Sequence, residues 1–342
     1  MTVSVKEVAA RAGVSVGTVS NVLNRPDSVR QSTIDKVQAA IEELGYVPND
    51  AARQLRAGRS QTLALVVLDV GNPFFTDVAR GVEKRAAREG LTVLLANSDE
   101  SGEREASHLA VFERQRVAGV LLSPVDDDHT RLGELRERGI PVVLVDRGAD
   151  QSEFPSVSVD DVAGGALAAQ HLLDSGRTKL AFVGGPLRIG QVSDRYEGAK
   201  HAIAAHDGAS LRLVGTDQMT LEEGLRAGAA LVALVHEGTI DGVICANDLL
   251  AIGVERALLF ATEPVRVPED VALVGYDDIS FAATAAVPIS SIRQPRDLIG
   301  ATAVELLLDE GSRPADAPAR QVVLAPDLVV RASSAGVVDA AP

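Results

Sequence analysis

Cysteine and aromatic residues are scarce in this chain. Its 342 residues include one cysteine and no tryptophan, and aromatic residues make up 3%. A lone cysteine cannot form an internal disulfide, which argues against the disulfide framework of a small secreted domain and favours a reducing compartment. Cys245 lies in the apolar run 242–246, where we expect a buried strand.

Targeting and membrane segments are also missing from the sequence. The N-terminus shows neither the positively charged start nor the apolar stretch of a secretory signal peptide. No apolar run approaches the roughly 18 residues that a membrane helix needs. These absences predict a cytoplasmic protein without a membrane partner.

Motifs of enzymatic chemistry are absent as well. Asp277 and Asp278 are adjacent carboxylates, but neighbours at a strand end point different ways, and no nucleophile with a general base accompanies them. The run Gly184-Gly185-Pro186 lacks the Lys-Ser/Thr of a phosphate-binding loop. Four histidines fall on predicted helices without metal-ligand spacing: His171, His201, His206 and His236. The sequence therefore predicts no catalytic residues, no metal site and no cofactor.

Positively charged residues are fewer than negatively charged ones, and their distribution along the chain is uneven. The formal net charge is −15, yet residues 1–60 carry eight Lys/Arg against six Asp/Glu, a net charge of +2. The remaining residues carry 25 basic against 42 acidic side chains, a net charge of −17. DNA phosphates would repel this acidic body, so any binding to nucleic acid is expected to use the N-terminal segment. A length of 342 residues with 46% hydrophobic residues suits two or three folded domains.

A short helix after Ser15 is the most informative element that is present. Ser15 is a suitable N-cap, and Val19, Val22 and Leu23 repeat at helical spacing, which predicts that they face a core. The opposite face carries short, mostly polar side chains: Val16, Gly17, Thr18, Ser20 and Asn21. Such a face can lie in a DNA major groove and reach base edges.

The preceding residues predict a partner helix. Ser4 and Glu7 form a capping box, an apolar stripe runs from Val5 to Ala12, and Gly13 suits the turn that follows. Helix, glycine turn and helix make the helix-turn-helix pattern, although two ordinary surface helices would look similar. A third helix is expected from a Ser32 cap to Gly45.

From Gln61 onward, short apolar strands alternate with amphipathic helices. Strands are predicted at Leu63–Leu68, Leu91–Ala96, Gly119–Leu122, Pro141–Val145, Leu180–Val183, Val243–Ala246 and Val271–Gly275, and the first of the helices at about 76–89. Such continuous runs are typical of parallel sheets covered on both faces. The number of strand–helix units predicts an α/β fold with two doubly wound lobes. We expect the chain to cross between them near 159–162, 289–293 and 325–327.

Polar residues follow many of these strands. Asp146 and Arg147 come after one strand, Asn247 after another and Asp277 after a third. Ligands bind at the carboxyl ends of open parallel sheets, so two facing lobes would form a polar cleft. Asn72-Pro73-Phe74-Phe75 lies at a predicted loop mouth and could offer an aromatic face to a sugar ring, or one phenylalanine could fill the lobe's core instead. Helix capping is the expected role of Asp248 and Asp278.

The motifs Val5-Lys6-Glu7-Val8-Ala9, Gly13-Val14-Ser15, Thr18-Val19-Ser20, Val22-Leu23-Asn24, Gly45-Tyr46-Val47-Pro48-Asn49 and Ala52-Arg53-Gln54-Leu55 resemble the LacI family of bacterial transcriptional regulators. The resemblance extends to about Arg331. It implies a helical DNA-binding headpiece (1–47), a hinge helix (48–60) and an effector and dimerisation domain (61–335) of periplasmic-binding-protein architecture. The N-lobe would span about 61–160 plus 293–325, and the C-lobe about 161–290 plus 326–335.

The resemblance also implies site residues. DNA would be contacted by Ser15, Val16, Gly17, Thr18, Ser20, Asn21, Asn24 and Leu55, with Leu55 of the hinge wedged into a base step. The arginine of the family's Arg-x-x-Gly pattern, here Arg195, would bind the effector. The full expected effector set is Asn72, Phe74, Phe75, Asp146, Arg147, Arg195, Asn247, Asp277 and Gln294.

The function that the resemblance implies is that of a repressor. We expect a homodimer on a near-palindromic operator in double-stranded DNA, controlled by a small polar effector, with a sugar favoured. A purine- or nucleoside-responsive regulator of the same family is the alternative. A solute-binding protein shares the expected cleft, but it needs an export signal and no headpiece.

Overall fold

The computed structural model describes residues 3–46, 60–148, 154–310 and 317–335. The chain divides into two compact units, Met1–Ser60 and Gln61–Pro342. Each unit has its own hydrophobic core. Residues 48–59 of the expected hinge, Leu55 among them, lie outside the described residues.

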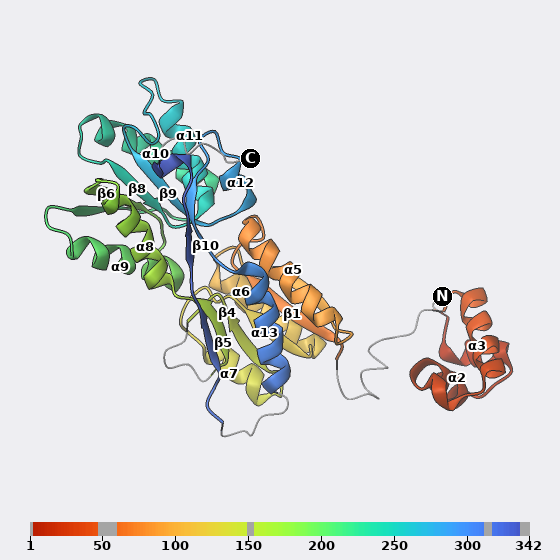
Figure 1. Ribbon diagram of the computed structural model, residues 1–342. Helices are drawn as coiled ribbons and strands as arrows, with labels where there is room; N and C mark the ends of the chain where they lie inside the picture. The colour runs from red at the N-terminus through yellow and green to blue at the C-terminus, as the bar shows by residue number, and fades with distance from the viewer. Residues whose placement is uncertain (1–2, 47–59, 149–153, 311–316, 336–342) are drawn as a thin grey trace. The chain divides into compact units, whose positions relative to one another are not determined.

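The first unit is a small helical domain (Figure 1). Its elements are α1 (Val5–Ala12), α2 (Val16–Asn24), the 3-10 turn η1 (Pro26–Ser28) and α3 (Gln31–Leu44). The backbone N–H of Ser4 donates to the Glu7 carboxylate at 2.7 Å, as the capping box predicts. Gly13 adopts a left-handed φ of 66° after α1, a conformation that glycine takes without strain. Six buried residues hold the three helices together: Val8, Ala9, Val19, Val22, Val37 and Ala40.

The expected Ser32 cap of the third helix is wrong. The helix α3 begins at Gln31, two residues before the start that a Ser32 cap implies, and Arg30 occupies the N-cap position without a side-chain cap. The Arg30 carbonyl accepts hydrogen bonds from the N–H groups of Thr33 and Ile34, so the first turn is closed by the backbone and does not need the Ser32 hydroxyl.

The second unit contains two six-stranded sheets, one in each lobe (Figure 1). The first sheet has the strand order β11-β5-β4-β3-β1-β2, and all its described pairs are parallel. Its strands are β1 (Thr62–Val67), β2 (Thr92–Asn97), β3 (Gly119–Leu122), β4 (Val142–Val145), β5 (Ser156–Val159) and β11 (Gln321–Leu324). This confirms the doubly wound architecture expected for the N-lobe.

Helices cover both faces of the first sheet. They are α5 (Pro73–Ala87), α6 (Gly102–Gln115), α7 (Thr130–Glu137) and α13 (Arg296–Glu310). Alternate residues of β1 face opposite ways: Leu63 and Leu65 join the core that contains α5 and α13, whereas Ala64 and Val66 join the core that contains α6 and α7. Burial on both faces explains why this strand reads as a continuous apolar run.

The second sheet has the order β12-β10-β9-β8-β6-β7, and only β12 among its described strands is antiparallel. Its strands are β6 (Lys179–Val183), β7 (Ser210–Val214), β8 (Gly242–Cys245), β9 (Ala272–Asp277), β10 (Ser290–Arg293) and β12 (Asp327–Val329). Its helices are α8 (Asp161–Asp174), α9 (Gly190–Ala204), α10 (Leu221–His236), α11 (Asp248–Leu259), α12 (Ser280–Ala283) and α14 (Ala332–Ala335).

The chain passes between the sheets three times. The passages follow β5 at Asp160, β10 at Gln294 and β11 at residues 325–326. The second passage lies beyond 289–293, because Ser290–Arg293 pair with both β9 and β12 in the second sheet.

Helix α9 lies against α8 at backbone distance. A Cβ atom added to Gly165 of α8 would come within 1.9 Å of the Arg195 carbonyl oxygen, and one added to Gly198 would come equally close to the Val162 carbonyl. The two glycines therefore permit an approach that places Arg195 beside the start of α8.

Candidate functional site

Helix α2 presents a short polar surface. Gly17, Asn21 and Asn24 are exposed, while the apolar side of the helix faces the small core through Val19 and Val22. Ser15 caps the helix, since its Oγ accepts from the Thr18 N–H at 3.0 Å. This arrangement leaves the middle of the helix open to a groove.

Four of the expected DNA-contacting residues have more contacts within the domain than the sequence indicated. Val16 is only half exposed, because it packs against the headpiece core. The Asn24 amide donates to the Ser20 carbonyl at 2.7 Å. Thr18 and Ser20 are half-buried. The exposed positions in the middle of the expected reading face are thus Gly17 and Asn21.

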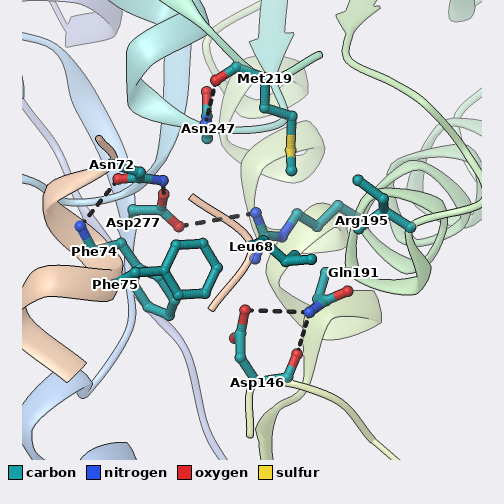
Figure 2. A pocket seen from close by; sticks show the side chains of 11 residues that line it. Leu68, Asn72, Phe74, Phe75, Asp146, Gln191, Arg195, Met219, Asn247 and Asp277 are labelled. Atoms are coloured by element: carbon teal, nitrogen blue, oxygen red, sulfur yellow. Dashed lines mark hydrogen bonds and ion pairs between the residues drawn. The ribbon is translucent and has the colours of Figure 1, made fainter. Parts of the chain in front are cut away.

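A pocket lies between the two lobes of the second unit (Figure 2). It encloses about 20 Å³. Leu68, Asn72, Phe74, Phe75 and Asp146 line it from the first lobe, and Ile189, Gln191, Arg195, Met219, Asn247 and Asp277 from the second. Seven of the nine expected effector residues therefore meet around one space.

Strand ends position the two pocket carboxylates. Asp277 closes β9 with a φ of 100°, and Asp146 follows β4 with a φ of 58°. Non-glycine residues rarely adopt positive φ, and such strained backbone concentrates at binding sites. The geometry places both carboxylates at the carboxyl edges of their sheets, as the sequence predicted.

Asn72 also caps a helix. Its Oδ1 accepts from the Phe74 N–H at 3.0 Å, and α5 begins at Pro73, three residues before the expected start. Proline is favoured at the first helical position, because its missing N–H has no partner there. Phe74 and Phe75 meet edge to face with ring centroids 4.9 Å apart. Both rings are buried and both line the pocket, so neither is only a core residue.

Arg195 is the buried cation of the pocket. Its Nε donates to Asp161 at 2.7 Å, its Nη1 donates to the Ala246 carbonyl at 2.7 Å, and Asp277 lies 3.8 Å away. The guanidinium also sits 3.7 Å from the ring centroid of Tyr276. Burial alone lowers the pKa of Arg195, but Asp161 and its other acidic neighbours outweigh burial and raise it, so the side chain stays charged.

The pocket carboxylates are poorly solvated. Burial raises the pKa of Asp146 well above its usual range, and Asp161 adds to the rise while Arg195 opposes it. Burial likewise raises the pKa of Asp277 against the opposing effect of Arg195. Hydrogen bonds donated to these two carboxylates would stabilise their charged forms.

Hydrogen bonds across the pocket join the lobes. Asn72 of the first lobe donates to Asp277 Oδ2 of the second at 3.0 Å. Gln191 of the second lobe donates to the Asp146 backbone carbonyl and, at 3.3 Å, to Asp146 Oδ2 of the first. Figure 2 shows both contacts on opposite sides of the space. The lobes thus close onto each other through the side chains that line the pocket.

Arg147 and Gln294 lie beside the pocket and do not line it. Arg147 pairs with Asp127 at 2.8 Å and, across the lobes, with Asp194 at 3.3 Å. Gln294 is buried at the second passage and donates to Asp277 at 2.8 Å. Gln294 therefore orients the Asp277 carboxylate without lining the pocket itself.

The expected capping roles of Asp248 and Asp278 are wrong. Asn247 caps α11 by accepting from the Leu250 N–H, and Asp248 instead accepts from Ser291 and the Ile279 N–H in the core. Asp278 pairs with Arg293 and Arg331. The Asp248 carboxylate thus connects the start of α11 to β10 and to the loop after β9. The Asp278 carboxylate connects that loop to β10 and to Arg331, which follows β12.

The sequence analysis missed several pocket residues. Gln191 was missed because it lies in the first turn of α9 (Gly190–Ala204), ahead of the Arg-x-x-Gly pattern that marked Arg195. The helical spacing of Val192 and Ala199 was the available signal for this helix. Asp161, which does not line the pocket but pairs with Arg195, was also missed. It follows the α8 cap Asp160, and a second acidic residue there was the available signal. Met219 lies in a loop without a pattern.

In the described part of the chain, no group of three or more His, Cys, Asp or Glu side chains is arranged to hold a metal ion. No described helix is long and apolar enough to cross a membrane.

Fold and site together define a helix-turn-helix headpiece joined to a two-lobed ligand-binding domain. Residues 4–49 match the family model of bacterial regulatory proteins, lacI family. Residues 60–322 match the model of periplasmic binding proteins and sugar binding domain of LacI family. The chain belongs to the LacI family of bacterial regulatory proteins.

Individual relatives agree over nearly the whole chain. The ribose operon repressor of Escherichia coli (strain K12) is 32% identical over 335 residues, which is 97% of this chain and 99% of the relative. The structure of a transcriptional regulator CelR–cellobiose complex has a TM-score of 0.70 at 33% identity, covering 97% of this chain and 99% of that one. The lac repressor dimer bound to operator and the anti-inducer ONPF has a TM-score of 0.82 at 27% identity, covering 98% and 99%.

Proposed function

We propose that this protein is a transcriptional repressor whose operator affinity is set by a neutral or weakly charged small effector, a sugar in the first place, bound between the lobes. The observation that carries the proposal is the pairing, in one chain, of an exposed, capped α2 helix with a polar pocket closed by both lobes. The relatives support it, since one is a ribose operon repressor and another was solved with cellobiose. A regulator that acts on DNA and has no enzymatic role would work in the cytoplasm.

The operator-bound form is a homodimer on a near-palindromic site. One α2 helix contacts too few base pairs to select a single genomic site, so two symmetric half-sites are needed. The lac repressor dimer bound to operator supports this arrangement. Within it, residues 1–47 form the headpiece, 48–60 the hinge that carries the Leu55 wedge, and 61–335 the effector and dimerisation domain.

Ligand and DNA are coupled through lobe closure. A ligand can shift the protein between two states only if it binds them with different affinity. The pocket supplies that difference, because Asn72 and Asp277, or Gln191 and Asp146, face one another only when the lobes are together. A purine or nucleoside remains the second candidate effector, because the paired rings of Phe74 and Phe75 offer apolar surface to a planar base.

The test uses the full-length protein in two stages. Selection from random duplex DNA is expected to return an inverted repeat, and recovery of no preferred sequence would rule out the repressor assignment and leave the solute-binding alternative. Operator affinity is then measured with and without each member of a panel of sugars, nucleosides and purines. We expect a sugar to change the operator affinity. If only purines change it, the effector is a purine and not a sugar.

A further inference from the structure

Tyr276 lies beside the pocket without lining it. It has the largest of the fully buried side chains in the described part of the chain, and it precedes Asp277 at the end of β9. Asp277 and Arg195 line the pocket, whereas Tyr276 does not. This ring can therefore affect a bound effector only through another residue.

The Tyr276 ring supports Arg195. The guanidinium carbon lies 3.7 Å from the ring centroid, which is van der Waals contact with the ring face. Burial and Asp161 raise the pKa of Tyr276, so the phenol stays neutral. The negative face of an aromatic ring attracts a cation, and the attraction is stronger where water is excluded, as it is around these two buried side chains.

Two hydrogen bonds complete the support of the guanidinium. Arg195 Nε donates to Asp161 and Nη1 donates to the Ala246 carbonyl, each at 2.7 Å. Within the described residues these are its hydrogen bonds, so Nη2 is left for a ligand. The ring and both acceptors belong to the second lobe. The orientation of Arg195 therefore does not depend on contact with the first lobe.

Two consecutive glycines of α8 make room for both members of this stack. A Cβ atom added to Gly164 would come within 2.0 Å of the Tyr276 hydroxyl oxygen, and one added to Gly165 within 1.9 Å of the Arg195 carbonyl oxygen. Glycine inside a helix costs stability relative to alanine. The close approach of the ring and of α9 accounts for both glycines, and it places the ring and the guanidinium against the same helix.

The ring of Tyr276, and not its hydroxyl group, makes the contact with Arg195. The hydroxyl oxygen is buried and has no hydrogen-bond partner among the described residues. A buried hydroxyl without a partner is unfavourable, because it has lost its bonds to water. Phenylalanine would keep the ring face and remove that group. A residue without a ring would leave the guanidinium unsupported on one side.

We infer that Tyr276 is a positioning residue of the effector site, whose ring holds the Arg195 guanidinium in its ligand-binding orientation before any effector arrives. The inference rests on the proposed effector-controlled function and adds to it a residue that does not touch the ligand. Preorganising a donor in this way raises affinity, because the binding energy is not spent on ordering the side chain.

The first experiment measures the guanidinium without a ligand. Nuclear magnetic resonance of the full-length protein with isotope-labelled arginine follows Arg195, whose signals are assigned by their loss in Arg195→Lys. Restricted rotation gives separate signals for the two Nη groups, and free rotation averages them. We expect restricted rotation in the parent and in Tyr276→Phe, and averaged signals in Tyr276→Met, which fills the space without a ring. Averaged signals in the unliganded parent, or equal restriction in Tyr276→Met, overturn the inference.

The second experiment measures binding of two probes, ribose and cellobiose, by titration calorimetry. A probe that binds the parent should bind Tyr276→Phe within about twofold of the parent affinity and Tyr276→Met about tenfold or more weakly. Operator affinity without sugar should be that of the parent in both variants, which shows that they are folded. Equal affinity of the parent and Tyr276→Met for the probe contradicts the positioning role.

Leu273→Ala is the matched control for lost packing. Leu273 is fully buried in the same strand, and strand alternation places it with Gly275, which faces α11, on the opposite side from Tyr276. Its truncation should lower the free energy of unfolding and leave the Arg195 signals and the probe affinity as in the parent. If it weakens the probe as much as Tyr276→Met does, the effect comes from packing and the positioning role is wrong.

The outcomes separate this inference from the proposed function. If neither probe binds the parent, a ribose or cellobiose response is contradicted, and the rotation of the Arg195 guanidinium still decides whether Tyr276 orients it. If a probe binds the parent and Tyr276→Met equally well, the inference fails and the sugar-responsive regulator is unaffected.

Discussion

Arg195 is held in place by buried ion pairs with two aspartates of the second lobe. Its side chain and that of Asp161 are each about 5% exposed, and Asp277 lies within 3.8 Å. Removing one member of a buried pair is costly, because it leaves the other charge unpaired in a poorly solvated place. The residue proposed to bind the effector therefore also contributes to the stability of the second lobe.

The first prediction separates these two roles. Arg195→Ala should lower the free energy of unfolding by about 3–5 kcal/mol, and Asp161→Asn in the same chain should recover part of the loss, because it removes the unpaired carboxylate. Denaturant unfolding of both variants measures the difference. Operator affinity with and without sugar should show no response in either one. A double variant that regains the response to sugar would remove Arg195 from the binding site.

Glu100 is a buried carboxylate at the lobe boundary. It accepts a hydrogen bond from the backbone N–H of Met219 in the second lobe, and the Arg188 guanidinium donates to its backbone carbonyl at 3.1 Å. Burial raises its pKa to about 7; the Met219 N–H and Arg188 oppose the rise, and Asp69 and Asp99 add to it. Because the raised pKa belongs to the closed lobes, closure takes up a proton.

The second prediction follows from this linkage. With a closed-state pKa of about 7 and an ordinary value when the lobes part, closure is favoured at low pH and its advantage is lost as pH rises through 7. Sugar affinity should fall by up to about tenfold between pH 6 and pH 8, and Glu100→Gln should remove that part of the pH dependence. Titration calorimetry at both pH values gives the comparison.

Glu105 provides a matched control. Its pKa is also raised to about 7 by burial, but its carboxylate accepts from the Val125 N–H within the first lobe, at 2.9 Å. Glu105→Gln should change the pH dependence of unfolding and leave that of sugar affinity as in the parent. If the two variants behave alike, the pH effect does not arise at the lobe boundary.

At the scale of elements, α2 has an unusual composition for a helix. Gly17 lies inside it without a positive φ, and a Cβ atom there would meet only Ser15 Oγ at 3.6 Å, an ordinary contact. A glycine in a helix interior costs stability relative to alanine, because it loses more backbone freedom on folding. Packing within the domain therefore does not require the glycine, which is consistent with its proposed contact with DNA.

The third prediction concerns this glycine. Gly17→Ala should stabilise the headpiece by up to about 1 kcal/mol and change the half-site that random-DNA selection returns. Hydrogen exchange of peptides from α1, α2 and α3 in the full-length chain reports the stability. Gly13→Ala is the contrast: with a φ of 66° at Gly13, it should destabilise the same helices by about 1 kcal/mol. An unchanged half-site for Gly17→Ala would mean that the reading face is assigned wrongly.

At the scale of the whole molecule, charge is divided between the two units. Residues 1–60 carry a net charge of +2 and the remainder carries −17. The acidic unit repels phosphate, so the affinity for DNA is expected to come from residues 1–60. Two headpieces in one assembly are then needed for a tight complex.

The fourth prediction is the assembly state. Sedimentation equilibrium of the full-length protein at micromolar concentration should show a dimer, both free and with operator. Operator affinity should fall with increasing salt, because headpiece cations displace counterions from DNA. A stable monomer under both conditions would contradict the dimeric repressor.

Local patterns in the sequence were sufficient for much of the fold. The Ser15 cap, the turn at Gly13 and the apolar positions Val19 and Val22 depend on residues a few places apart, so α1 and α2 were predictable. Apolar runs marked β1, β3, β4, β6 and β8, because both faces of these strands are buried. Polar residues at strand ends likewise indicated Asp146 and Asp277.

The strands that the sequence analysis missed lack such continuous apolar runs. The edge strand β7 (Ser210–Val214) is largely exposed, β5 (Ser156–Val159) alternates serine with valine, and β12 has three residues. These segments form strands mainly because they pair with strands that are distant in the sequence. A local sequence pattern carries no information about such pairing.

The pocket was decided by tertiary structure in the same way. The sequence by itself determined which residue types stand at strand and helix ends, and hence a polar cleft. Only the folded lobes join Arg195 to Asp161 and Gln191 to Asp146, pairs separated by 34 and 45 positions. These contacts require α9 to approach α8 at Gly165 and the lobes to meet, because hydrogen bonds and charges act over a few ångströms whatever the distance along the chain.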